Sequence, residues 1–116
     1  MEKTYKLKMY DETYNIMLRK TTYKNNGTLA IAMVCINEDG YEEDFGMLTT
    51  NINDSDILAD DSSAFIDTNN LSNEIVGWLT KNKIAKQTPF MGFSGYCSYP
   101  LMHFNENVIN NMVEYV

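Results

Sequence analysis

The sequence predicts an α+β fold: a mostly antiparallel sheet of about four to six strands with two short helices, at about residues 71–82 and 106–114. Strand-forming segments separated by hairpin turn signals fill the first half, whereas helix-periodic segments come only in the second half. A chain of 116 residues with 44% apolar side chains can bury one core. We therefore expect a single globular domain over residues 1–116.

The first half of the chain contains the clearest strand signals. Strands are expected at residues 3–9, 13–23, 28–36 and 41–50. The segment 28–36 (TLAIAMVCI) is apolar on both faces, which predicts a central strand covered on both sides. Turn signals at residues 25–27 and 38–40 flank it, because Asn, Asp and Gly tolerate positive φ angles. Gly46 is expected to mark a bulge in the strand that follows.

Two segments of the second half have the apolar period of a helix. Leu71, Ile75 and Leu79 repeat at helical spacing over residues 71–82, and we expect Gly77 to allow close packing against the central strand. Asn105 is placed as the N-cap of the helix at 106–114. The segment between the helices, 92–104 (GFSGYCSYPLMHF), is expected to be a loop that leads into an edge strand, because its proline cannot donate to a ladder.

The net charge of −7 is unevenly distributed along the chain. Residues 25–80 contain eleven acidic side chains and no Lys or Arg. A segment of one sign repels nucleic acid and attracts basic surfaces, so we expect no direct nucleic-acid binding and a protein partner with a basic surface. The candidate partner-binding residues are acids of this segment: Glu42, Glu43, Asp44, Asp54, Asp56, Asp60 and Asp61.

Other classes of protein find little support in the sequence. No apolar run approaches the roughly 20 residues that span a bilayer, and the first ten residues have no secretory signal, so we expect a cytoplasmic location without membrane contact. The acids of the loop 51–62 do not have the spacing of a calcium loop, because counting from Asp54 places Leu58 at the fifth position, which needs an acid, and Ala59 at the sixth, which needs Gly. No cofactor, phosphate-binding loop or metal site is expected.

Catalytic residues are not expected either. A Cys97–His103 dyad with Asp67 or Asn69 orienting the ring is conceivable. On one regular strand, however, residues six positions apart lie about 20 Å from each other, so a turn at Pro100 would be required. A Cys97-dependent enzyme therefore remains an alternative, and the sequence leaves enzymatic activity open.

The stretch SAFIDTNNLSN at residues 63–73 allows two interpretations. An apolar run ends in four polar residues immediately before the first helix. The structural interpretation is that Asn69 or Asn70 caps the helix and Asp67 makes an Asx-turn. The alternative is a small-molecule or nucleotide-binding pocket between residues 67–70 and 95–101. Its polar contacts and stacking wall would come from Asp67, Asn69, Tyr96 and Tyr99.

Three motifs occur in order: NNGTLAI at 25–31, AFIDTNN at 64–70 and SGYCSYPLMHF at 94–104. Together they resemble a family of small uncharacterised proteins, a domain of unknown function of Gram-positive bacteria, whose members occur in conjugative elements and prophages. The chain departs from the pattern at Met102 and His103, where the family tends to have Tyr and an acid. Because the second and third motifs accompany each other, we expect Asp67 to contact residues 94–99.

The resemblance carries no activity to transfer, but it implies an accessory gene of mobile DNA. Combined with the acidic middle segment, it predicts a non-enzymatic accessory protein of a mobile element or phage. Such a protein would bind another protein, for instance a host defence component, by presenting negative charge to a basic groove.

Overall fold

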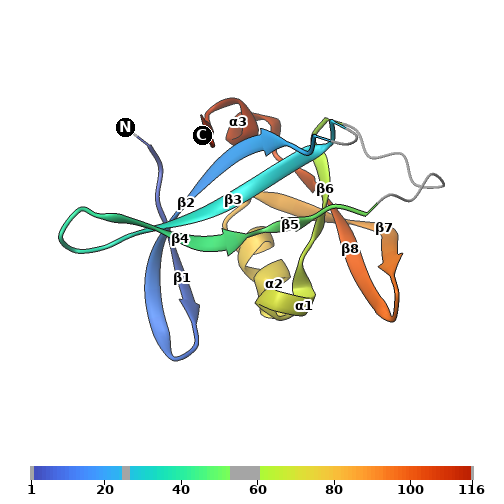
Figure 1. Cartoon of the computed structure of the whole chain (residues 1–116), viewed down its shortest axis with the longest axis horizontal. Helices are drawn as coiled ribbons and strands as arrows, with labels where there is room; N and C mark the ends of the chain where they lie inside the picture. Colours follow the sequence, from blue (N-terminus) through green and yellow to red (C-terminus); the bar gives the residue numbers. More distant parts are fainter. Residues whose placement is uncertain (1, 25–26, 53–60, 116) are drawn as a thin grey trace.

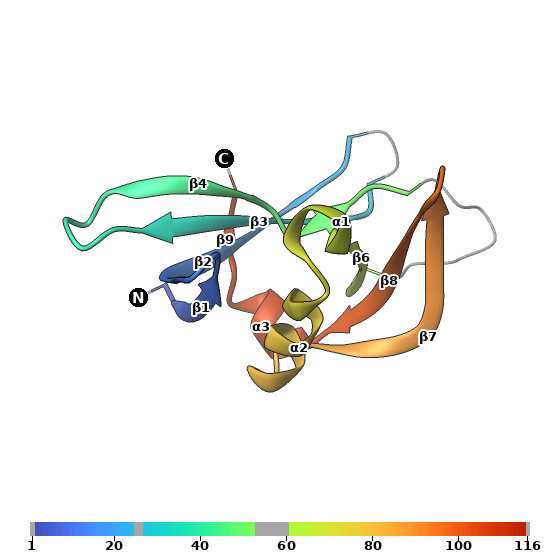
Figure 2. The same ribbon diagram turned by 90° about the horizontal axis from the view of Figure 1, so that it is seen from below.

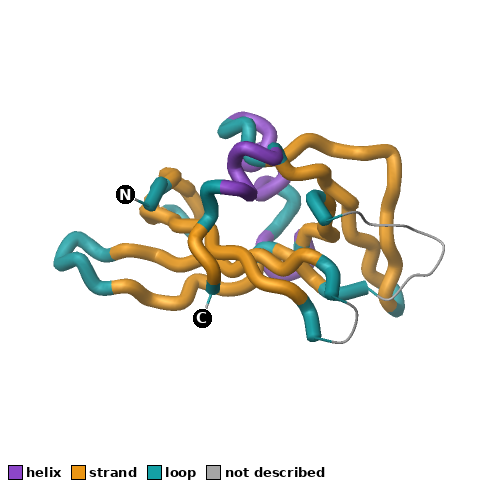
Figure 3. Tube along the Cα trace, turned by 90° about the horizontal axis from the view of Figure 1, so that it is seen from above, coloured by secondary structure: helices purple, strands orange, loops and turns teal. Residues whose placement is uncertain are grey.

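The computed structural model in Figure 1 describes residues 2–24, 27–52 and 61–115 and confirms the predicted α+β class with mostly antiparallel strands. The strands are β1 (Tyr5–Met9), β2 (Glu12–Thr22), β3 (Leu29–Ile36), β4 (Glu42–Met47), β5 (Thr49–Thr50), β6 (Ser63–Ile66), β7 (Ala85–Ser94), β8 (Cys97–Phe104) and β9 (Val113–Glu114). The helices are α1 (Thr68–Leu71), α2 (Glu74–Lys81) and α3 (Glu106–Asn110). Figures 2 and 3 show the helices in the middle of the molecule, with strands on either side.

The strands form two sheets rather than the one expected. The first has the order β1-β2-β3-β4, and β9 pairs with β2 in parallel. Its strand β3 lies between β2 and β4, and the side chains of its first six residues are buried, which confirms the predicted central strand. In the turn after β3, the N–H of Asn37 donates to the carbonyl of Tyr41 and the N–H of Gly40 donates to the carbonyl of Asn37; Gly40 has a φ of 85°, as the turn signal predicted.

The predicted strand at 41–50 bends and contributes to both sheets. Its β4 part has the expected bulge, because Met33 pairs with Gly46 while Val34 pairs with Asp44. The buried Leu48 then joins β4 to β5: its N–H donates to the carbonyl of Ile31, and its carbonyl accepts from the N–H of Asp67. One residue thus hydrogen-bonds to a strand of the first sheet and to the end of β6 in the second.

The second sheet has the order β5-β6-β8-β7 and contains a strand that the sequence did not predict. The segment that forms β7 includes Pro89 and Gly92, two residues that normally argue against a strand. The expected loop and edge strand at 92–104 is wrong, because β8 lies between β6 and β7. Pro100 fits there because it pairs with Met91 beside an interruption of the β7–β8 ladder, where a missing donor is tolerated.

The predicted helix at 71–82 is broken into α1 and α2. Ser72, at a φ of 68°, ends α1, and α2 begins at Glu74. The expected close packing of Gly77 is wrong, since a Cβ atom there would have no neighbour within 4 Å. Contact with the first sheet comes instead from Trp78, which donates to the carbonyl of Lys6 and meets the Tyr5 ring edge-on.

The last helix begins as predicted and ends early. The Asn105 side chain accepts from the N–H of Asn107 at 3.0 Å, which confirms it as the N-cap of α3. The helix stops at Asn110 rather than 114, because residues 113–114 pair with Arg19 and Lys20 of β2.

Buried side chains form two clusters of unequal size. The large one joins the inner face of the first sheet to the helices and to β6 and β8, and includes Ile31, Ile75 and Phe104. The small one lies in the second sheet and contains Phe65, Tyr99 and Leu101. Strand β8 therefore contributes to both clusters, with Phe104 in the large one and Tyr99 and Leu101 in the small one.

Candidate functional site

An acidic hairpin forms one end of the molecule. The sequence-predicted residues Glu42, Glu43 and Asp44 lie on β4 and are exposed. The turn between β3 and β4 adds the exposed Glu38 and Asp39, which were not among the predicted residues although they belong to the same acidic segment. Figures 1 and 2 show that this hairpin extends from the body at the end opposite to β7 and β8. We call these five residues and their two strands the acidic hairpin.

Arg19 on β2 neutralises part of this charge. Its two terminal nitrogens bind the two Glu42 oxygens, each at 2.9 Å, and the same guanidinium binds both oxygens of Glu2 at 3.0 Å. The hydrogen bonds from Arg19 lower the pKa of Glu42. The pKa of Arg19 is raised in turn, first by its bond to Glu2 and then by that to Glu42. Glu42 therefore ties β4 to β2, and the charges of Glu38, Asp39 and Glu43 are those most available to a partner.

The remaining predicted acids do not extend this surface in the described structure. Asp61 is exposed but lies just before β6, in the second sheet. Asp54, Asp56 and Asp60 lie outside the described residues.

Asp67 is the cap of a helix and also faces a cavity. Its carboxylate accepts hydrogen bonds from the backbone N–H of Asn70 at 3.2 Å and from the Asn70 side chain at 2.8 Å, so it is the N-cap of α1. The cap expected at Asn69 or Asn70 thus falls to Asp67, and Asn69 is an exposed residue of α1. Helix α1 contacts β8, but the hydrogen bonds of the Asp67 carboxylate come from Asn70, so the expected contact of Asp67 with residues 94–99 stays a prediction.

Asp67 and Asn70 line a cavity of about 560 Å³, which we call the tyrosine cleft. Its other wall is not the predicted segment 95–101. The residues around the cleft are Tyr10, Tyr14, Tyr23, Phe45, Gly46, Met47, Thr49, Thr50, Asn51, Asp67, Asn70 and Leu71. The sequence pattern indicates its tyrosines only as strand formers, because nothing local shows that residues 10 to 23 meet residue 67.

The two tyrosines selected from the sequence lie elsewhere. Tyr96 is fully exposed at the turn between β7 and β8, and Tyr99 is buried in the small cluster. Burial raises the pKa of Tyr99, with further contributions from Cys97 and from the negative charge of Asp67. Asp67 is therefore close enough to influence Tyr99 electrostatically, although neither Tyr96 nor Tyr99 lines the tyrosine cleft.

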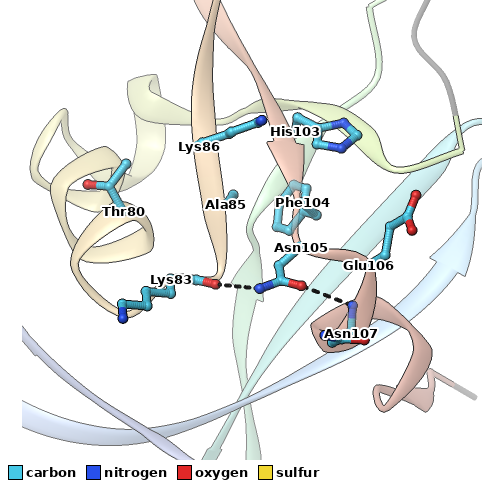
Figure 4. A pocket seen from close by; sticks show the side chains of 9 residues that line it. All are labelled: Thr80, Lys83, Ala85, Lys86, His103, Phe104, Asn105, Glu106 and Asn107. Atoms are coloured by element: carbon cyan, nitrogen blue, oxygen red, sulfur yellow. Dashed lines mark hydrogen bonds between the residues drawn. The ribbon is translucent and has the colours of Figure 1, made fainter.

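A second cavity, of about 570 Å³, lies beside His103 (Figure 4). The His103 ring nitrogen Nδ1 lies 3.2 Å from the Ser63 hydroxyl, across the β6–β8 pair. Cys97 begins the same strand that His103 almost ends, so the two do not form a dyad. The Asn105 amide on the cavity wall is engaged with the Lys83 carbonyl and the Asn107 N–H, and therefore serves the backbone.

The described residues contain neither a metal-binding cluster nor a membrane-spanning helix. No group of three or more His, Cys, Asp or Glu side chains is arranged to hold a metal ion among residues 2–24, 27–52 and 61–115. Within the same part of the chain, none of the helices has the length and apolarity required to cross a bilayer. Both cysteines, Cys35 and Cys97, are partly buried free thiols.

The two sheets, the acidic hairpin and the tyrosine cleft define a small α+β protein with two candidate binding surfaces. A family model described as "Domain of unknown function (DUF4313)" matches residues 17–115, and the chain belongs to this family. Comparison with curated proteins and with solved structures gave no match.

Proposed function

We propose that this chain is a non-enzymatic binding protein whose acidic hairpin engages a basic surface of a partner protein. The observation that supports this most is the hairpin itself, an extended arm in which Glu38, Asp39 and Glu43 are exposed on one projecting element. Such an arm concentrates negative potential on one projecting element. A partner's groove that holds nucleic acid has positive potential, so the two surfaces are complementary.

The wider setting of this proposal comes from the sequence resemblance. We propose an accessory protein of a mobile element or phage that acts in the cytoplasm, with a host defence component as the partner class. A nucleic-acid-binding protein of the host would offer a basic groove of the required charge.

The test is partner capture with two charge-matched variants. The hairpin variant carries Glu38→Gln, Asp39→Asn, Glu43→Gln and Asp44→Asn, all exposed positions. The control variant carries Asp11→Asn, Glu74→Gln, Glu106→Gln and Glu114→Gln, which remove the same charge from exposed positions elsewhere. We expect the first to lose a partner that the second retains, and we expect binding to weaken as salt is raised. Equal retention by both variants would reject the hairpin as the binding surface.

A small-molecule-binding protein is the second candidate. The observation that favours it is the tyrosine cleft, whose volume of about 560 Å³ lies in the range of ligand sites and whose wall includes Asp67. A thermal-shift screen of the wild type against a Tyr10→Leu variant tests it. Ligands that belong to the cleft stabilise the wild type more than the variant, whereas an absence of any such ligand speaks against this function.

A further inference from the structure

Aromatic residues from separate elements line the tyrosine cleft. Tyr10 lies in the β1–β2 turn, Tyr14 on β2, Tyr23 just after β2, and Phe45 on β4. The Tyr14 and Phe45 rings meet edge to face with centroids 4.9 Å apart. Four aromatic side chains thus border one cavity, although their positions in the sequence span 36 residues from first to last.

Hydrogen bonds to the phenol oxygens hold three of these rings. The Tyr10 hydroxyl donates to the carbonyl of Asn70 at 3.4 Å, which joins the β1–β2 turn to α1 across the cleft. The Tyr14 hydroxyl donates to a Glu12 oxygen at 3.0 Å, and the Tyr23 hydroxyl lies 2.8 Å from the Thr49 hydroxyl. These hydrogen bonds restrain the orientation of three of the aromatic rings that border the cleft.

The cleft carries a single formal charge, and it is negative. Among its described lining residues Asp67 is the one acid, and none is Lys, Arg or His. Asp67 acts on the aromatic wall: burial raises the pKa of Tyr23, the Asp67 charge adds to this, and the Thr49 bond opposes it. A cation is therefore attracted by the carboxylate and also by the ring faces, which are the negative sides of aromatic quadrupoles.

Asn70 occupies two of the roughly four acceptor positions of the Asp67 carboxylate, which favours a cation with few hydrogen-bond donors. Both carboxylate oxygens already accept from Asn70, one from its backbone and one from its side chain. A primary ammonium brings three strongly hydrated donors that need acceptors when they leave water. A methylated ammonium has an apolar shell with few or no donors, so aromatic faces and one nearby negative charge are sufficient for it.

We infer that the tyrosine cleft binds a methylated ammonium group, carried either by a free small molecule or by a modified lysine side chain. This inference deepens the small-molecule candidate above and does not depend on the acidic hairpin.

The test is a titration of the ¹⁵N-labelled protein with choline, followed by its amide signals. We expect the signals of Gly46 and Asn70, which line the cleft, to shift while those of Gly92 and Gly95 in the β7–β8 hairpin stay in place. The neutral isostere 3,3-dimethylbutan-1-ol should shift them far less, because it has the same shape without the charge. Titrations with a trimethyllysine peptide and with its unmethylated form identify the source of the methylated ammonium. If the methylated peptide binds more tightly than choline, the source is a protein. If choline binds more tightly, the source is a small molecule.

Two variants with matched controls locate the site. Asp67→Asn removes the charge but leaves a residue that still caps a helix, and Asp61→Asn removes an exposed charge elsewhere. Tyr10→Leu removes a ring that is 67% exposed, and Tyr96→Leu is its exposed counterpart. Each cleft variant should weaken choline binding by about threefold or more, with both controls unchanged.

The variant of the acidic hairpin should bind choline like the wild type, so a failure of this inference is separable from a failure of partner capture. Equal shifts with choline and its neutral isostere, or equal affinities of the cleft and control variants, would overturn the inference.

Discussion

The two long hairpins at opposite ends of the molecule differ in the way they meet solvent (Figure 1). The acidic hairpin exposes carboxylates, which water solvates at little cost. The β7–β8 hairpin has no charged residue from Gln87 to Met102, yet it exposes Phe90, Met91, Phe93 and Tyr96. Exposed apolar side chains in such a group mark an interaction surface more often than isolated ones do.

The two hairpins also differ in the contacts that stabilise them. In the acidic hairpin, β4 is held by pairing with the long, central β3 and by the ion pair between Arg19 and Glu42. The β7–β8 hairpin depends on the small cluster around Phe65, where Gly92 of β7 gives the ring room. One hairpin is therefore supported by the shared core and one ion pair, whereas the part of the other that contains Tyr99 and Leu101 packs in the small cluster. The following changes test that difference.

The largest effect is expected from Phe65→Ala. Phe65 is the largest side chain of the small cluster apart from Tyr99, and its loss should lower the free energy of unfolding by about 3–5 kcal/mol. The control is Phe93→Ala on β7, where the ring is 65% exposed and the change should stay within about 0.5 kcal/mol. Urea denaturation measures both, and similar losses would show that the small cluster does not support the hairpin.

A second effect is expected from Gly92→Ala. The added Cβ would lie 2.6 Å from Cε1 and 2.9 Å from Cδ1 of the Phe65 ring. Overpacking of this kind lowers stability by about 1–3 kcal/mol.

The matched control is Gly77→Ala in α2, where a Cβ has no neighbour within 4 Å. Because Ala is the better helix former, this change should raise stability by up to about 1 kcal/mol. A shift of the same sign in both variants, measured by urea denaturation, would contradict the close packing at Gly92.

The smallest effect concerns the ion pair of the acidic hairpin and pH. The Arg19 hydrogen bonds lower the folded-state pKa of Glu42 below its ordinary 4.5. The stabilisation is therefore present above about pH 4.5 and is lost as the pH falls through the lowered folded-state value. Thermal unfolding of the wild type and of Glu42→Gln should differ at neutral pH and converge in acid. A difference that persists unchanged in acid would exclude the ion pair as its cause.

Local sequence patterns predicted the elements whose shape depends on neighbouring residues in the chain. The β3 segment is apolar at every position, and its turn ends in Gly40, so both were recognisable. Asn105 precedes an acidic first turn and caps its helix as expected. Along the acidic hairpin, the exposure of Glu42, Glu43 and Asp44 follows from charge alone.

Tertiary contacts decided the rest. Leu48 divides one strand-like segment between two sheets because its backbone bonds to Ile31 and Asp67, residues far from it in the chain. The β7 segment, with Pro89 and Gly92, is a strand because β8 and Phe65 stabilise it.

The candidate site shows the same division. The sequence by itself indicated that Asp67 is either a cap or a site residue, and it identified Glu42, Glu43 and Asp44 of the acidic hairpin. Only the folded chain brings Tyr10, Tyr14 and Tyr23 opposite Asp67, because the β1–β2 turn reaches α1 through space. Local patterns determine which residues can be exposed, extended or capping, but a cavity depends on long-range packing, and no periodicity within one segment records it.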